Sequence, residues 1–109
     1  MKEFNEKRKT LNDLMIGHDE FFQQFGSLDD SVYADGAIPK KYKELTGLSI
    51  SVLTRCDECI QYHIQGCLSN QASTDEIIEA VKIGVIGGGS ITYPSARLAF
   101  SILKKLDVI

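Results

Sequence analysis

Apolar residues recur at helical spacing along almost the whole of this 109-residue chain. Near the start, Phe4, Leu11, His18 and Phe25 follow at intervals of seven, which is typical of one face of a long helix. Only residues 48–52 alternate between apolar and polar side chains, and no second run of this kind exists to pair with them. We therefore interpret that run as helix as well. The pattern predicts an all-α fold of about six helices, in a single domain over residues 1–109.

Residues that start or stop helices mark the expected boundaries. We expect the first helix to end at Gly26, and a short second helix to follow and end near Gly36. Pro39 and Pro94 suit the first turn of two later helices, because proline lacks the N–H that has no intrahelical partner there. Three consecutive glycines at positions 87–89 are expected to end a helix, since glycine loses the most conformational freedom inside one.

Two polar segments predict helix caps. Thr54, with Asp57 three positions later, is expected to cap one helix. Ser73 and Glu76 have the spacing of a capping box, in which each side chain accepts a hydrogen bond from the other residue's backbone N–H. The helix after Ser73 is apolar over so wide an arc that other elements must cover both of its sides. Gly84 within it is expected to permit the close approach of another helix.

The charge balance and the short apolar stretches exclude several partners. Twelve Lys and Arg against fifteen Asp and Glu give a net charge of −3 without a long basic cluster, so we expect no nucleic-acid binding. The apolar stretches fall far short of the roughly 18 residues that a membrane-spanning helix needs. The first residues are too charged for a signal peptide. We therefore expect a cytoplasmic protein that does not bind membranes.

Three cysteines and a histidine lie at helical spacing, as Cys56, Cys59, His63 and Cys67. Cysteines in a reducing compartment are more typical of catalytic, metal-binding or buried roles than of a disulfide framework. If the segment is helical, the Cα atoms of Cys56 and Cys59 lie about 5–6 Å apart, which a disulfide tolerates. One zinc ion cannot bind all four residues, because they span about 16 Å of helix whereas zinc–ligand bonds are about 2 Å.

The C-x-x-C pair of Cys56 and Cys59 leaves three interpretations open: a redox dithiol, half of a zinc site completed by another chain, and chance burial. A thioredoxin-type site is a poor fit, because no strand precedes the motif. A helix N-terminus favours a thiolate, at Cys56 most strongly. The imidazole of His63 lies one turn from Cys59 and offers that thiol a base.

The run C-x-x-C-Ile-x-x-His from Cys56 to His63, with the capping box, apolar helix and glycine-rich break after it, resembles the alkylhydroperoxidase D and carboxymuconolactone decarboxylase superfamily. The resemblance covers about residues 38–106, and its most specific element is a glutamate twelve positions before the first cysteine, here Glu44. Without the resemblance, Glu44 would be interpreted as a surface carboxylate paired with Lys40. The chain departs from the alkylhydroperoxidase D pattern at Glu58, where that branch often has histidine, and it lacks a second helical repeat.

The resemblance implies a thiol-dependent peroxidase of the peroxiredoxin type, with Glu44, Cys56, Cys59 and His63 as catalytic residues. Glu44 and His63 would deprotonate Cys59, which would attack a hydroperoxide, become a sulfenic acid and condense with Cys56 to a disulfide. An external dithiol would reduce that disulfide, without a cofactor or metal ion. The alternatives are a cofactor-free lactone decarboxylase-type lyase or isomerase on the same fold, and a non-catalytic dithiol or disulfide carrier.

The first helix and the helix of residues 77–86 carry more apolar surface than a compact chain of this size needs to cover. This excess predicts a homo-oligomer, and the resemblance implies a trimer or hexamer of helical protomers. We interpret Cys67 as a small core residue, because buried free cysteine packs like an apolar side chain. His18 is expected to belong to the core or to an interface.

Overall fold

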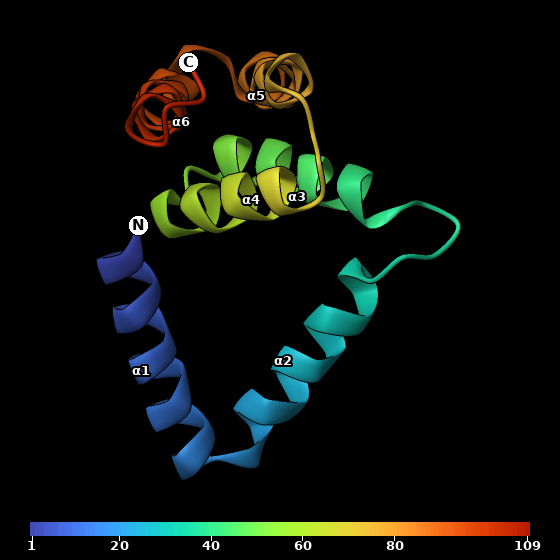
Figure 1. The fold of residues 1–109 in the computed structure, drawn as a ribbon, viewed down its shortest axis with the longest axis vertical. Coiled ribbons are helices and arrows are strands. Elements are labelled where there is room, and N and C mark those ends of the chain that lie inside the picture. The colour runs from blue at the N-terminus through green and yellow to red at the C-terminus, as the bar shows by residue number, and fades with distance from the viewer. The chain divides into compact units, whose positions relative to one another are not determined.

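A computed structural model describes all 109 residues as helices joined by short connections, with no strand (Figure 1). The all-α prediction is confirmed, and the run at residues 48–52 is helical as expected. The elements in chain order are α1 (Lys2–His18), α2 (Glu20–Tyr33), α3 (Lys40–Thr54), α4 (Asp57–Ser69), α5 (Thr74–Gly88), the 3₁₀-helix η1 (Gly89–Thr92) and α6 (Tyr93–Lys105).

The chain divides into two compact units, Met1–Ala34 and Asp35–Ile109. The first unit is a pair of helices, α1 and α2, in which no residue is buried. Its apolar side chains are largely exposed, among them Phe25 at 60% and Leu28 at 62%. A helix pair of this kind cannot derive much stability from a core of its own.

The break between α1 and α2 lies at Asp19, so the prediction that the first helix ends at Gly26 is wrong. Asp19 has extended backbone angles, and its carboxylate accepts a hydrogen bond from the N–H of Phe21 at 2.9 Å. This side-chain cap begins a new helix, which then continues through Gly26.

His18, the last residue of α1, is exposed rather than part of a core. Its Nδ1 lies 2.9 Å from the carbonyl oxygen of Leu14, one turn earlier. The prediction of a core position is therefore wrong, and a position in an interface stays a prediction.

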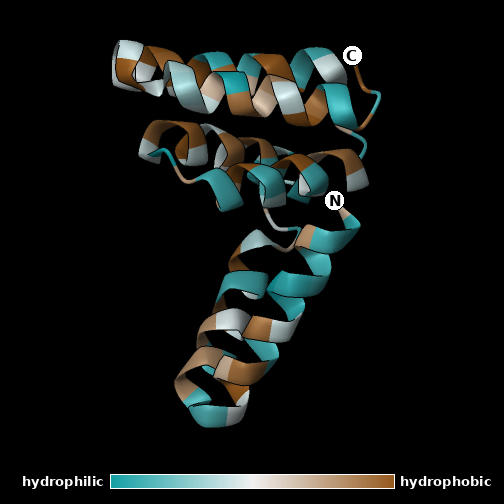
Figure 2. Ribbon diagram, turned by 90° about the vertical axis from the view of Figure 1, so that its left-hand side faces the viewer, coloured by the Kyte–Doolittle hydropathy of each residue, from teal (hydrophilic) through white to brown (hydrophobic).

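The second unit holds the hydrophobic core. Helix α3 packs against both α4 and α5, and α6 packs against α4. Figure 1 shows α5 and α6 as a layer over α3 and α4, and Figure 2 shows that apolar residues recur along each of these helices. The largest fully buried apolar side chains are Leu48 and Val52 of α3, Ile60 and Ile64 of α4, Ile77 of α5 and Leu103 of α6.

Gly84 allows α5 to lie directly on α3. A Cβ atom at this position would come within 2.7 Å of both the Ser49 carbonyl oxygen and the Val52 Cβ. Nearby, the Ser49 hydroxyl donates a hydrogen bond to the carbonyl oxygen of Ala80 at 2.7 Å. The expected close approach of a second helix at Gly84 is confirmed.

The capping box at the start of α5 is confirmed. The Ser73 hydroxyl accepts a hydrogen bond from the Glu76 N–H at 3.1 Å, and the Glu76 carboxylate accepts one from the Ser73 N–H at 2.8 Å. Pro94 lies in the first turn of α6 as expected, and Pro39 is the residue immediately before α3. Helix α5 extends into the glycine run and ends at Gly88, before the positive φ of Gly89.

Thr54 does not cap α4, because it is still the last residue of α3. Its hydroxyl donates back to the carbonyl oxygen of Ile50 at 2.8 Å. The chain then turns through Arg55, which has left-handed backbone angles, and Cys56 is the N-cap of α4. The cap is therefore a sulfur atom two residues later than expected.

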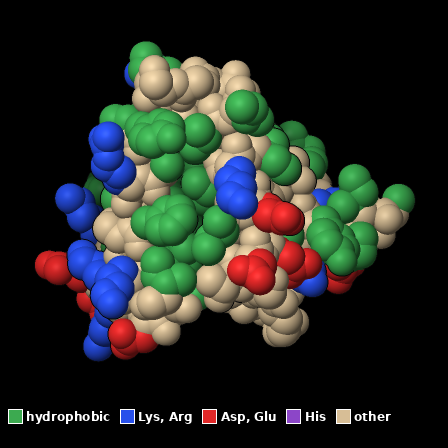
Figure 3. Space-filling model, turned by 90° about the horizontal axis from the view of Figure 1, so that it is seen from above, with side chains coloured by type: hydrophobic (Ala, Val, Ile, Leu, Met, Phe, Trp, Pro, Cys, Tyr) green, Lys and Arg blue, Asp and Glu red, His purple; other side chains and the backbone are tan.

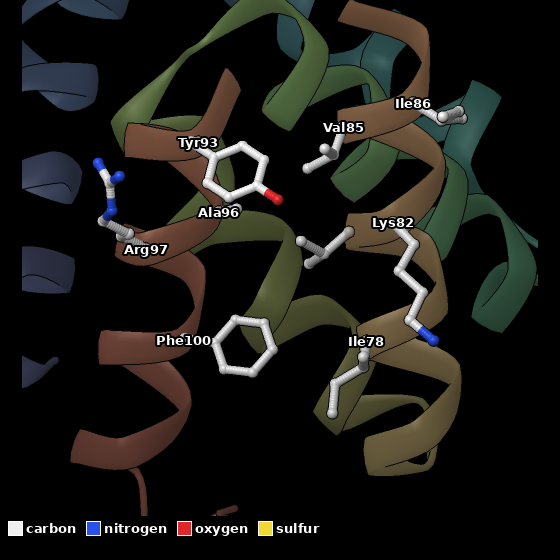
Figure 4. A pocket seen from close by; sticks show the side chains of 9 residues that line it. Ile78, Lys82, Val85, Ile86, Tyr93, Ala96, Arg97 and Phe100 are labelled. Atoms are coloured by element: carbon white, nitrogen blue, oxygen red, sulfur yellow. The ribbon is translucent and has the colours of Figure 1, made fainter. Parts of the chain in front are cut away.

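The face of the second unit formed by α5 and α6 carries many exposed apolar side chains (Figure 3). An open groove of about 690 Å³ runs between the two helices. Tyr93 and Phe100 of α6 and Val85 of α5 project into it, and Arg97 of α6 also lines it (Figure 4). No helix in the chain is both long enough and apolar enough to cross a membrane.

Candidate active site

Glu44 and His63 form a hydrogen-bonded pair between α3 and α4. Glu44 Oε1 lies 3.0 Å from His63 Nδ1, and the side chains are only 4% and 12% exposed. An ionised carboxylate can only accept hydrogen bonds, so Nδ1 donates the proton of this bond. In a neutral His63 that donates through Nδ1, the ring nitrogen that carries the basic lone pair is Nε2.

Glu44 is almost completely buried, at 3% exposure, which excludes the surface carboxylate that would be inferred without the family resemblance. The ion pair with Lys40 that accompanied that interpretation does exist, at 3.8 Å between Lys40 Nζ and Glu44 Oε2. The two carboxylate oxygens therefore have different partners, an imidazole on α4 and an ammonium group one turn earlier on α3.

Gly66 on α4 provides the space for the Glu44 carboxylate, and sequence analysis missed it. A Cβ atom at Gly66 would lie 2.7 Å from Glu44 Oε1 and closer still to Oε2. The available signal was a glycine inside a helix, three residues after His63 and so on the same face. Such a glycine costs helix stability and calls for a packing reason.

Cys56 and Cys59 are joined by a disulfide at the start of α4. Their Cα atoms are 5.2 Å apart, within the range expected from helical spacing. Cys56 Sγ also accepts a hydrogen bond from the Cys59 N–H at 3.3 Å, so this sulfur caps the helix. His63 lies one turn further along α4 than Cys59, and the ring of Tyr62 meets the His63 ring edge to face at 5.2 Å.

Cys67 takes no part in this disulfide. It is a free thiol with no exposed surface, which confirms its place in the core. Burial raises the pKa of the Cys67 thiol to about 12, and the negative charges of Glu44 and Glu76 act in the same direction. Cys67 therefore stays protonated and unreactive at neutral pH.

The four residues predicted from the sequence, Glu44, Cys56, Cys59 and His63, thus lie on two adjacent helices. Direct contacts link them as two pairs, the disulfide and the Glu44–His63 hydrogen bond. No cluster of three or more His, Cys, Asp or Glu side chains has the arrangement needed to hold a metal ion. Chemically, the arrangement offers a dithiol and a base held by a buried acid.

Comparison with known proteins identifies the family of the chain. The model of the carboxymuconolactone decarboxylase family matches residues 19–104. The chain belongs to the carboxymuconolactone decarboxylase family. The superfamily resemblance stated from the sequence is therefore confirmed, and the match includes all four predicted site residues of this family member.

Similar solved structures share the fold over nearly the whole chain. A family protein from Thermotoga maritima is 40% identical, with a TM-score of 0.94 over 98% of this chain and 95% of that one. A second structure of that protein, for which a role in antioxidative response has been suggested, also matches. Its TM-score is 0.91, over 96% of this chain and 90% of that chain. A family protein from Legionella pneumophila, solved in its apo form, is 27% identical and covers 96% of this chain and 97% of that chain, with a TM-score of 0.83.

Among curated proteins, the chain is similar to uncharacterized protein 4 in the cox locus of Paracoccus denitrificans. The two are 30% identical over 83 residues, which are 76% of this chain and 75% of that protein.

Proposed function

We propose that this protein is a thiol-dependent peroxidase in which Cys56 and Cys59 cycle between dithiol and disulfide, with Glu44, Cys56, Cys59 and His63 as its catalytic residues. The observation that carries the proposal is the Glu44–His63 hydrogen bond of 3.0 Å beside the Cys56–Cys59 disulfide. A buried carboxylate that orients a histidine is the arrangement by which a base is prepared to take a proton from a nucleophile.

The chemistry begins with the reduced pair. His63 takes the proton of the Cys59 thiol, and the thiolate attacks the terminal oxygen of a hydroperoxide. The O–O bond breaks, Cys59 becomes a sulfenic acid, and the alkoxide leaves and receives the proton as an alcohol. The Cys56 thiol then attacks the sulfenic sulfur and releases water, which forms the disulfide. An external dithiol reduces this disulfide and becomes a disulfide itself.

Two features of the pair support this cycle. The helix already places the two Cα atoms 5.2 Å apart, a separation at which cysteines bond without backbone movement. Both residues are half-buried rather than enclosed, so a hydroperoxide and a small dithiol have access to them. A reducing compartment such as the cytoplasm would return the pair to its dithiol form.

The proposal is tested by counting free thiols in the reduced protein before and after one equivalent of hydroperoxide. Two thiols per chain should disappear together, and Cys59→Ser should abolish the reaction. Cys67→Ser should leave it intact, because that thiol is buried and protonated. Undiminished hydroperoxide consumption by the Cys59→Ser protein contradicts the proposal. A sulfenic acid trapped on Cys56 in that variant reverses the roles of the two cysteines.

The second candidate is a cofactor-free lyase or isomerase acting on a lactone or keto acid. The observation that favours it is the family match itself, together with an acid–base pair, Glu44 and His63, that does not depend on the sulfur atoms. Lactone turnover that survives in the double variant Cys56→Ser/Cys59→Ser but is lost in Glu44→Gln would select this function. If neither substrate is consumed while a dithiol reduces the pair, a disulfide carrier is the remaining function.

We also propose that the protein works as a homo-oligomer, a trimer or hexamer. The exposed apolar side chains of α1 and α2 and the groove between α5 and α6 support association, because contiguous apolar surface of this extent is typical of interfaces.

A further inference from the structure

Lys40 stands beside the proposed relay, and neither the sequence motif nor the family comparison assigns it a role. It is the first residue of α3 and contacts Glu44 one turn later. At 3.8 Å from Oε2, its ammonium group attracts the carboxylate by charge. The opposite oxygen, Oε1, is the one that accepts the hydrogen bond from His63.

Burial makes this contact important. The Glu44 side chain is 4% exposed, whereas that of Lys40 is 38% exposed. An ionised carboxylate withdrawn from water is costly unless a positive charge or hydrogen bonds compensate it. His63 cannot supply a positive charge while it serves as a neutral base. During that step, the ammonium group of Lys40 is a positive charge in contact with the Glu44 carboxylate.

The geometry also restricts how the carboxylate can rotate. Gly66 leaves space on one side, Lys40 attracts Oε2, and His63 binds Oε1. The start of α3 is itself fixed, because the Asp35 carboxylate accepts the backbone N–H of Lys40 at 2.7 Å. The ammonium group therefore extends from an anchored turn.

We propose that Lys40 is a positioning residue that acts through Glu44: it holds Oε2, so that Oε1 keeps the Nδ1–H tautomer of His63 and leaves Nε2 as the base. This inference rests on the proposed function for its role in catalysis. The tautomer that it specifies is a property of the resting protein. Its test can therefore fail separately from the test of peroxidase activity.

The neighbouring residue provides a matched control. Lys41 is also on α3 but pairs with Glu76 of α5, at 3.1 Å from its Oε2. Lys40→Met and Lys41→Met remove the same charge from adjacent positions of one helix, and only the first removes the contact with Glu44. Both variants also retain the Cys67 thiol, whose pKa is raised by burial and by the charges of Glu44 and Glu76.

The experiment measures the ring ¹⁵N chemical shifts of His63 in the reduced protein, with His18→Asn used to assign the signals. The rate of dithiol oxidation by hydrogen peroxide is measured alongside. We expect Lys40→Met to lose part of its Nδ1–H tautomer and to react about fivefold more slowly, the size expected of an ion pair with one exposed partner. Lys40→Arg should restore both values, and Lys41→Met should match the wild type.

Identical His63 spectra in Lys40→Met and Lys41→Met would overturn the proposal, whatever the rates. If the wild type does not react with peroxide, the proposed function fails while the spectra still decide the role of Lys40. Circular dichroism confirms folding, and Lys40→Gln serves as the second variant if Lys40→Met is unstable. Loss of the Nδ1–H tautomer in Lys40→Arg as well would also contradict the role of a positive charge.

Discussion

Gly66 on α4 faces the carboxylate of Glu44 on α3 so closely that any side chain at Gly66 would overlap it. The acid can be buried because the helix opposite has no side chain at this point. His63, three residues before Gly66, then meets the same carboxylate at 3.0 Å. One turn of α4 thus supplies both the partner of the acid and the space that the acid fills.

Replacing Gly66 with alanine should displace the carboxylate and break its hydrogen bond to His63. The overlap costs about 1–3 kcal/mol, and the better helix propensity of alanine offsets about 1 kcal/mol of this. We expect a modest loss of stability with a large loss of peroxide-dependent thiol oxidation. Thermal unfolding and stopped-flow rates on the same samples measure both quantities.

Gly84→Ala is the control for this change, because its new methyl group would meet Ser49 and Val52 rather than Glu44. It should lose stability but keep the activity per folded molecule. If Gly66→Ala retains full activity, the carboxylate is not needed where the structure places it.

Glu44→Gln keeps the shape of the side chain but removes its charge. Without a carboxylate to orient His63, we expect the oxidation of Cys59 by hydroperoxide to slow by about 10²-fold, the lower end of the range for general acid–base catalysis. Glu79→Gln, at an exposed position of α5, removes one negative charge away from the pair and should react like the wild type. An unchanged rate in Glu44→Gln would remove the carboxylate from the mechanism.

The Cys67 thiol should make stability fall in alkaline solution. Its pKa is raised from 9.0 to about 12 in the folded chain, so above pH 9 the unfolded chain loses this proton while the folded chain keeps it. The contribution of Cys67 to the free energy of unfolding is thus fully present below the pKa of the unfolded chain. It declines between that pKa and the pKa of the folded chain, by up to about 1.4 kcal/mol per pH unit. Urea unfolding of the wild type and Cys67→Ala, from about pH 8 to about pH 10.5, measures this difference.

The lysines with raised pKa values, Lys9 and Lys41, also titrate in alkaline solution. They are present in both proteins, so their effect cancels when the wild type is compared with Cys67→Ala. Parallel stability curves for the two proteins would show that the thiol ionises while it is still folded.

An acidic side chain in the exposed apolar surface should disrupt the proposed assembly. Ile86 on α5 is 85% exposed and lines the groove between α5 and α6. We expect Ile86→Glu to dissociate the oligomer in sedimentation velocity without unfolding the chain, because the residue is outside the core. Ile38→Glu, at a position 56% exposed before α3, is the control and should sediment as the wild type does. A wild-type protein that sediments as a monomer would contradict the assembly itself.

Several correct predictions have strictly local causes. The capping box at Ser73 and Glu76 and the proline at the start of α6 depend on residues a few positions apart, and the structure has both. The bonding distance between Cys56 and Cys59 follows from helical spacing alone. These features need no information about the rest of the chain.

The errors arose where two local signals competed, or where the environment of a residue depends on another helix. The side-chain cap at Asp19 decides the break between the first two helices, whereas Gly26 is tolerated inside α2. At Glu44, the local pairing with Lys40 is real, but burial depends on contacts with α4 that no spacing on α3 reveals. Gly66 was missed for the same reason, because its role is to leave room for a residue of another helix.

The groups argued to do the chemistry all come from residues 40–66, two consecutive helices joined through Arg55 and Cys56. The other helices of the chain contribute none of these groups. One uninterrupted stretch of chain therefore carries every proposed reacting group, and α5 and α6 pack on that stretch to complete its core.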